Sequence, residues 1–423
     1  MSEVRLDDAC DSTGKTELST GWPVLLAATL GCGAGLSSLP FYSLGTFIAP
    51  LQQEFGWARG EISASFLYLT LTLTLTLALT APALGWLLDR IGPRKIAMVA
   101  IPCFAAVLFA MSRFDGPLVA FHSLFAIAAL AGGGTCPILY TRAVNARFHK
   151  VRGLALGITL AGMGIAAIVL PPLLSVIIAE HGWRTGYLLL ACLALVPWLF
   201  VITAFRNTAV EARPKPAQRR AVLTGALTSR IFWTIALGFA AIAIAVSALV
   251  VHMVPLLRDA GMPPLQAATV ASFTGFGVLL GRLVIGWLID RFFAPRVAAI
   301  VFTLTAVGCL LLVYGGPLAA PFAAFLIGFS LGAEVDLISY LTARYFGMSA
   351  YGVLYALIYA CFIVGASIGP VLAGKIFDMT GNYSLAIWTV IGLLLTGAGA
   401  TLTLPRFDAS PAKLNPSPDP IES

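Results

Sequence analysis

Long apolar stretches separated by short polar turns dominate the sequence. About twelve of them reach the roughly 20 apolar residues that a helix needs to cross a bilayer. They cover residues 22–50, 61–88, 95–112, 117–142, 152–179, 184–205, 231–257, 265–289, 297–314, 318–342, 350–376 and 383–404. The Thr/Leu alternation at 70–77 has the period of a strand, but a lone strand inside an apolar stretch would leave its backbone without partners in lipid. The pattern predicts an all-α membrane protein with twelve transmembrane helices.

Polar segments divide this pattern into two halves. The longest polar interval between apolar stretches, residues 206–230, is rich in Arg, Lys and Pro and lies near the middle of the chain. We therefore expect an N-terminal tail at 1–20, a six-helix bundle at 21–205, a linker at 206–230, a second six-helix bundle at 231–405 and a disordered tail at 406–423.

Charge is scarce and unevenly placed. Only 11% of the residues are charged, against about 25% in soluble domains, which excludes an ordinary soluble enzyme. Twenty of the 26 basic residues fall in the tails and loops of one side and four on the other, so we expect both termini in the cytoplasm. Membrane topology, not nucleic-acid binding, then explains the net charge of +7. The cysteines show no metal-ligand spacing, and we expect neither a metal nor a cofactor.

An internal repeat links the two halves. The segment GWLLDR at 85–90 returns as GWLIDR at 286–291, 201 residues later and at the same end of its span. A parallel repeat of six helices is typical of transporters whose substrate path runs between the halves.

The repeated segment resembles the signature loop of the major facilitator superfamily. The matching positions are Gly85, Leu87, Asp89, Arg90, Gly92, Arg94 and Lys95 in the first half and Gly286, Asp290 and Arg291 in the second, with Phe293 in the place of Gly92. Segments 54–63, 281–290 and 332–347 are similar to bacterial monocarboxylate and oxalate/formate porters. The resemblance covers all twelve spans. It implies the major facilitator fold, with two pseudo-symmetric bundles, in a bacterial inner membrane, and we expect a monomer.

The signature loop is a candidate gate. Asp89 can bind the N-terminus of a neighbouring helix, and Arg90 can pair with acids across the boundary between the halves. The alternative is an ordinary basic loop on the cytoplasmic side. We expect the gating group to comprise Gly85, Asp89, Arg90, Gly92, Arg94, Gly286, Asp290 and Arg291.

Arg282 is the most informative single residue. It lies eight residues before Asp290, about 12 Å inside the cytoplasmic end of its helix. A cation at that depth is costly unless it is paired, and its planar fork suits a carboxylate. In the monocarboxylate porters that the sequence resembles, an Arg at this position binds the substrate anion. The alternatives are a structural ion pair and a side chain that snorkels to the membrane interface.

Three other titratable residues are candidates for charge balance or proton coupling. Glu334 and Asp336 lie near mid-membrane on nearly opposite faces of one helix. One acid could balance Arg282 while the other carries a proton, or both could serve packing. His252, near the outer end of the seventh span, is a weaker candidate.

Polar aromatic residues complete the expected substrate site. Tyr42 and Ser38 on the first span, and Tyr355 and Tyr359 on the eleventh, could donate hydrogen bonds to a carboxylate, or could pack between helices. By local alignment, Tyr42 stands where animal-type monocarboxylate porters carry a Lys. Their Asp before the span-eight Arg appears here as Val278, so that proton relay is not reproduced.

These observations favour a secondary transporter for a small organic anion, in particular a monocarboxylate. It would work by alternating access, with a proton or a counter-anion as coupling partner, and it would not be an enzyme. An exporter of amphipathic drugs or metabolites is one alternative. The other is a membrane sensor that has the transporter fold but moves nothing.

Overall fold

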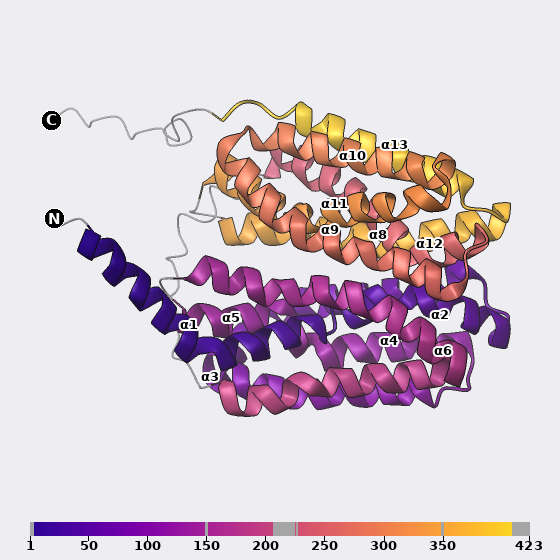
Figure 1. Ribbon diagram of the computed structural model, residues 1–423, viewed down its shortest axis with the longest axis horizontal. Coiled ribbons are helices and arrows are strands. Elements are labelled where there is room, and N and C mark those ends of the chain that lie inside the picture. The colour runs from indigo at the N-terminus through magenta and orange to yellow at the C-terminus, as the bar shows by residue number, and fades with distance from the viewer. Residues whose placement is uncertain (1–3, 149–150, 206–224, 226, 348–350, 408–423) are drawn as a thin grey trace.

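The computed structural model describes residues 4–148, 151–205, 225, 227–347 and 351–407, apart from the side chains of 4–16, 77–93 and 352. The described chain is helical and contains no strand. Two bundles lie side by side, with α1–α6 in one and α8–α13 in the other (Figure 1). Helix α1 begins and helix α13 ends at one end of the molecule, which we call the tail end; we call the opposite end, where α2 ends, the far end (Figure 1).

The first bundle contains six elements. They are α1 (Val4–Gly33), α2 (Leu39–Phe55), α3 (Arg59–Ser112), α4 (Leu118–Gly132), α5 (Pro137–Arg147) and α6 (Arg152–Ala204), with the short 3₁₀ turn Gly133–Thr135 between α4 and α5. The 54 residues of α3 carry the predicted second and third spans. The Thr/Leu run lies inside this helix, so the prediction of a helix there is confirmed.

The second bundle has one helix per predicted span. It consists of α8 (Arg230–Asp259), α9 (Pro264–Arg291), α10 (Ala294–Tyr314), α11 (Gly316–Phe346), α12 (Tyr351–Thr380) and α13 (Ser384–Leu402). Within it, α9 packs along α11 and α8 along α12. Nine helices in the described chain are long and apolar enough to cross a membrane. The 53-residue α6 is long enough to cross twice, with the break at Gly182, whose φ of 80° is readily adopted only by glycine.

Two predicted spans are interrupted, which the apolar pattern did not indicate. The run 22–50 divides into α1 and α2 around residues 34–38, and the run 117–142 divides into α4 and α5 at 133–136. Leu36 N–H donates to the Thr135 hydroxyl (3.0 Å), so the two breaks lie against each other. That bond supplies a partner to a backbone group freed by the interruption, as membrane burial requires.

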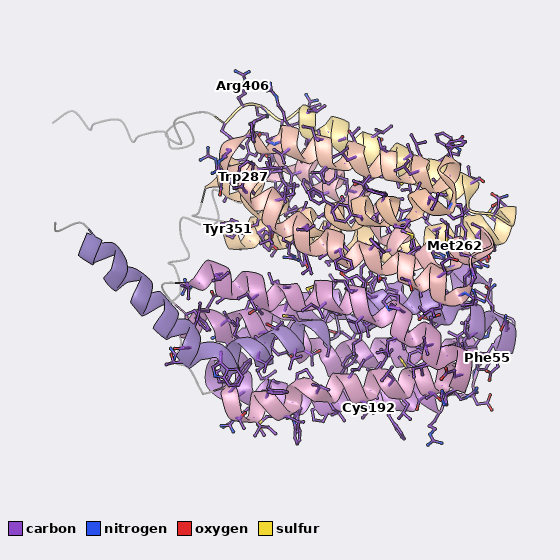
Figure 2. The ribbon with its side chains drawn as sticks, viewed as in Figure 1. Phe55, Cys192, Met262, Trp287, Tyr351 and Arg406 are labelled. Carbon is purple, nitrogen blue, oxygen red and sulfur yellow. The ribbon has the colours of Figure 1, made fainter. Side chains whose placement is uncertain are left out.

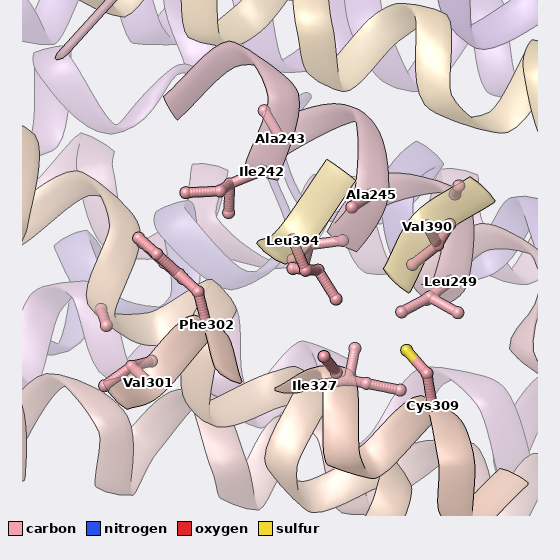
Figure 3. Packing of buried hydrophobic residues seen from close by; sticks show 14 of the residues in the cluster. Ile242, Ala243, Ala245, Leu249, Val301, Phe302, Cys309, Ile327, Val390 and Leu394 are labelled. Atoms are coloured by element: carbon pink, nitrogen blue, oxygen red, sulfur yellow. The ribbon is translucent and has the colours of Figure 1, made fainter. Parts of the chain in front are cut away.

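Each bundle has its own apolar core. In the second bundle, residues from four helices interdigitate, among them Ile242 of α8, Phe302 of α10, Ile327 of α11 and Leu394 of α13 (Figure 3). The first bundle is filled by two separate clusters, one of them rich in phenylalanine. Between the bundles, α12 packs on α3, α6 on α9 and α2 on α8. The expected linker and C-terminal tail lie mostly outside the described residues, so their boundaries stay predictions.

Candidate functional site

Arg282 projects from the middle of α9 toward α11. Its guanidinium lies 3.8 Å from the Asp336 carboxylate, and its side chain is 17% exposed. At that separation the two groups form an ion pair without a hydrogen bond. The Nε of Arg282 is buried and has no partner among the described residues. The cation is therefore balanced in charge but retains free donors.

The two acids of α11 have different surroundings. Asp336 faces Arg282 with a side chain 36% exposed. Glu334 is 1% exposed, and its Oε1 accepts a long hydrogen bond from the Ser330 hydroxyl (3.4 Å). Its Oε2 is buried without a partner in the described chain. Asp336 thus lies beside a cation and Glu334 beside a serine hydroxyl. A charge-balancing or coupling role for either acid stays a prediction.

Aromatic residues of both bundles lie within electrostatic range of the cation. Tyr42 on α2 is buried and lies close enough to Arg282 and Glu334 to interact with both electrostatically. Tyr355 and Tyr359 on α12 also interact with Arg282. Four residues that the sequence singled out thus lie near Arg282, namely Asp336, Tyr42, Tyr355 and Tyr359. A cation with hydroxyl donors nearby can bind an anion.

Ser38 has a local role at the break between α1 and α2. Its side chain is fully buried, and its hydroxyl donates to the Cys32 carbonyl at 2.6 Å. The donor that sequence analysis assigned to substrate is therefore already used by the backbone of the interrupted span.

His252 lies at the far end, in a chain of hydrogen bonds between the bundles. Its Nε2 is 2.8 Å from the Pro370 carbonyl and 3.1 Å from the Ser63 hydroxyl, and its Nδ1 is 2.8 Å from the Tyr383 hydroxyl. Because a carbonyl only accepts, Nε2 carries the proton and Nδ1 accepts from Tyr383, which assigns the neutral tautomer. The proposed coupling role of His252 stays a prediction, and its contacts are those of a link between bundles.

Arg59, at the start of α3, makes the strongest contacts between the bundles. It binds both carboxylate oxygens of Asp259 (2.6 and 3.1 Å) and donates to the Tyr383 hydroxyl (2.9 Å). Its guanidinium also lies 3.8 Å from the ring centre of Phe377. Bidentate, charge-assisted bonds of this kind are among the strongest polar contacts.

Asp378 of the second bundle caps a helix of the first. Its two carboxylate oxygens accept from the backbone N–H groups of Arg59 (3.0 Å) and Gly60 (2.8 Å). An anion at the N-terminus of α3 satisfies free donors and complements the helix dipole. A Cβ on Gly374 would lie 2.6 Å from Gly60 Cα, so only glycine permits this approach.

Apart from His252, sequence analysis assigned no role to these far-end residues. Arg59 lies in a segment quoted for its family resemblance, and that was the only available signal. We call Arg59, Ser63, Asp259, His252, Asp378 and Tyr383 the far-end latch.

The expected gating group lies at the tail end. The side chains of Gly85, Asp89, Arg90 and Gly92 fall outside the described residues. Asp290 and Arg291 are exposed, and Arg291 stacks on Trp287 at 4.2 Å. Arg94 has a buried Nε that finds no partner in the described part of the chain. Their gating role stays a prediction.

Known proteins with the same architecture include several transporters. The human monocarboxylate transporter 11 is 29% identical over 406 residues, which cover 91% of this chain and 83% of the relative. The gallate transporter of Pseudomonas putida is 27% identical over 418 residues, which cover 88% of this chain and 90% of the relative. The solved structure of a nucleoside transporter superimposes with a TM-score of 0.71 at 15% identity, covering 90% of this chain and 98% of the other.

The family assignment rests on the whole chain. The model of the Major Facilitator Superfamily matches residues 30–370 and 253–421. Both halves of the chain are therefore matched, as the internal repeat predicts. Together with the two-bundle helical architecture, this match shows that the chain is a membrane transporter of the major facilitator superfamily.

Proposed function

We propose that this protein carries a small monocarboxylate across the membrane and that Arg282 binds its carboxylate. The observation that carries the proposal is the set of free donors on Arg282: among the described residues its guanidinium has a 3.8 Å ion pair with Asp336 and a buried Nε without a partner. A substrate carboxylate could occupy those donors in bidentate geometry. Relatives named for monocarboxylates and for gallate support the same ligand chemistry.

The proposed mechanism is alternating access, and the position of the far-end latch supports it. Hydrogen bonds and an ion pair between described residues join the bundles at the far end. This conformation closes the far end, and breaking the latch would expose the site there instead. By the distribution of basic residues, the tail end is the cytoplasmic one.

Glu334 is the proposed proton carrier. A carboxyl group with 1% exposure and one unpartnered oxygen is expensive to hold as an anion in a membrane. Binding of the substrate anion beside Arg282 would change the local charge that Glu334 senses, which couples the two events. Asp336 balances Arg282 when no substrate is bound.

Uptake of labelled propionate and benzoate into vesicles containing the purified full chain tests substrate binding. Arg282→Gln should lower transport efficiency at least about 30-fold, because truncation of one partner in a desolvated charge pair is costly. Arg282→Lys keeps the positive charge but loses the planar guanidinium, so its transport efficiency should lie between those of Arg282→Gln and the unaltered chain. Arg113→Gln, an exposed loop arginine, is the matched control. Normal uptake by Arg282→Gln would overturn the proposal. Absence of flux of any acid, with binding retained, would favour a sensor.

The same vesicles with an imposed pH gradient test coupling. We expect an inward proton gradient to accelerate uptake by the unaltered chain, and Glu334→Gln to abolish that acceleration while it retains exchange of labelled for unlabelled acid. Glu180→Gln, an exposed acid at the far end, should behave like the unaltered chain. Continued acceleration by the gradient in Glu334→Gln would remove Glu334 from the coupling role.

A further inference from the structure

A row of stacked tyrosines runs along α12 beside the candidate substrate site. The rings of Tyr351 and Tyr355 have centroids 5.6 Å apart at an interplanar angle of 20°, and Tyr355 and Tyr359 are 5.6 Å apart at 11°. Phe362 continues the series at 5.6 Å and 18°. We call Tyr351, Tyr355 and Tyr359 the tyrosine row. The planes of successive rings are therefore nearly parallel along α12.

The tyrosine row faces the centre of the molecule. The exposed aliphatic residues of α12, Leu357, Val364 and Ile368, lie on the opposite side of the helix. Tyr359 interacts electrostatically with Arg282 in its own bundle and with Cys136 in the other. Figure 2 places Tyr351 at the tail end of α12, on the side facing the first bundle. The row therefore extends from the tail end toward Arg282.

The hydroxyl groups distinguish this row from simple packing. Tyr351 shares a hydrogen bond of 2.7 Å with Ser339. The Tyr355 and Tyr359 hydroxyls make no hydrogen bond within the part of the chain that the structure describes. All three rings are half-buried. Phenylalanine, as at Phe362, would pack equally well at lower cost, because a hydroxyl without a partner in a membrane interior is unfavourable.

From this arrangement we infer that the tyrosine row makes the site selective for aromatic carboxylates. The inference rests on the proposed function of Arg282. A substrate carboxylate bound to the guanidinium places its hydrocarbon part against the row. A flat ring gains stacking contacts there that a saturated ring of equal size does not. Polar ring substituents would accept from the free hydroxyls of Tyr355 and Tyr359.

Two acids of the same size and charge test the inference. Benzoate and cyclohexanecarboxylate differ in aromaticity, and their binding to the purified full chain can be compared by competition against a labelled acid. We expect the unaltered chain to bind benzoate about three- to tenfold more tightly. Tyr359→Leu and Tyr355→Leu should reduce that preference, whereas Tyr359→Phe should retain it. Tyr314→Leu is the matched control, since Tyr314 is 73% exposed at the end of α10.

The outcomes separate this inference from the proposed function. Equal affinity for the two acids in the unaltered chain, or an unchanged preference in both leucine variants, would overturn the role of the row. If both acids still lose binding in Arg282→Gln, the carboxylate site itself stands. If Arg282→Gln binds both acids normally, the proposed function fails and the inference fails with it.

Discussion

At the far end, Arg59, Ser63 and the helix start at Gly60 bind residues of the second bundle through a connected set of polar contacts. At the tail end, polar residues that the structure describes, such as Asp290 and Arg291, are exposed. Between the ends, α6 and α9 cross at two glycines, where a Cβ on Gly275 would lie 2.6 Å from the Gly164 carbonyl oxygen. The described chain thus has polar contacts between the bundles at the far end and a close backbone contact between them in the middle.

The chemistry of the far-end latch suits a contact that must break. Its groups are ionic or hydrogen-bonded, and they range from the buried Ser63, His252 and Tyr383 to Asp259, whose side chain is 38% exposed. Most of the apolar core of the second bundle lies away from the latch, among residues such as Ile242, Phe302 and Leu394 (Figure 3). A polar contact can exchange its protein partners for water when it opens, which a packed apolar core cannot do.

The largest expected effect comes from Arg59→Gln. This change removes the bidentate pair with Asp259 and the cation–π contact with Phe377, worth about 1–2 kcal/mol together. The population open at the far end should rise roughly five- to thirtyfold. A cysteine introduced by Val251→Cys reports this open population, because Val251 is fully buried among first-bundle residues and would be reached by a reagent only when the bundles separate there. The measurement is the rate of labelling by a membrane-impermeant maleimide, with the chain lacking this substitution as the blank.

Arg113→Gln is the control for this labelling experiment, since Arg113 is an exposed loop arginine of the same bundle. Equal labelling of Val251→Cys with and without Arg59→Gln would show that the latch does not hold the far end closed.

A smaller effect is expected from Asp378→Ala. Loss of a capping carboxylate leaves two N–H groups of α3 without their partner, at a cost of about 1 kcal/mol. We expect the apparent melting temperature in detergent to fall by about 2–4 °C, together with a modest rise in far-end labelling. Asp115→Ala removes an acid that is 86% exposed and should change neither quantity. A lower melting temperature without extra labelling would assign Asp378 to helix stability alone.

The candidate substrate site around Arg282 and the far-end latch differ in how far the sequence could predict them. Charges inside apolar stretches are scarce, so Arg282, Glu334 and Asp336 are conspicuous from the sequence alone. The spacing of Tyr355 and Tyr359 placed both on one face of a helix. The fold followed from hydrophobic runs and one repeated segment.

The far-end latch gave no such signal. Arg59, Asp259 and Asp378 lie in short loops or at helix ends, where charge is ordinary, and they are far apart in sequence. The interruptions at 34–38 and 133–136 were missed because the length of an apolar run does not register helix breakers; Gly133, Gly134 and Pro137 mark the second break in the sequence. The role of Ser38 was missed for the same reason.

The smallest expected effect concerns Glu54, whose contacts lie at the far end but within one bundle. The pKa of Glu54 lies below its ordinary value of 4.5, chiefly because the Trp183 indole donates to its carboxylate and also because Arg184 pairs with it. The stability that this arrangement contributes is fully present above pH 4.5 and is lost as the pH falls through the lowered pKa. Both side chains of the Glu54–Arg184 pair are more than a third exposed, so the contribution is about 0.5 kcal/mol.

Melting temperatures at about pH 6 and about pH 3.5 should therefore differ less in Glu54→Gln than in the unaltered chain. Labelling of Val251→Cys should be the same with and without Glu54→Gln, because Glu54, Trp183 and Arg184 all belong to the first bundle. If Glu54→Gln raised far-end labelling as much as Arg59→Gln does, closure would depend on the general polarity of the far end. The specific contacts between the bundles would then not be its cause.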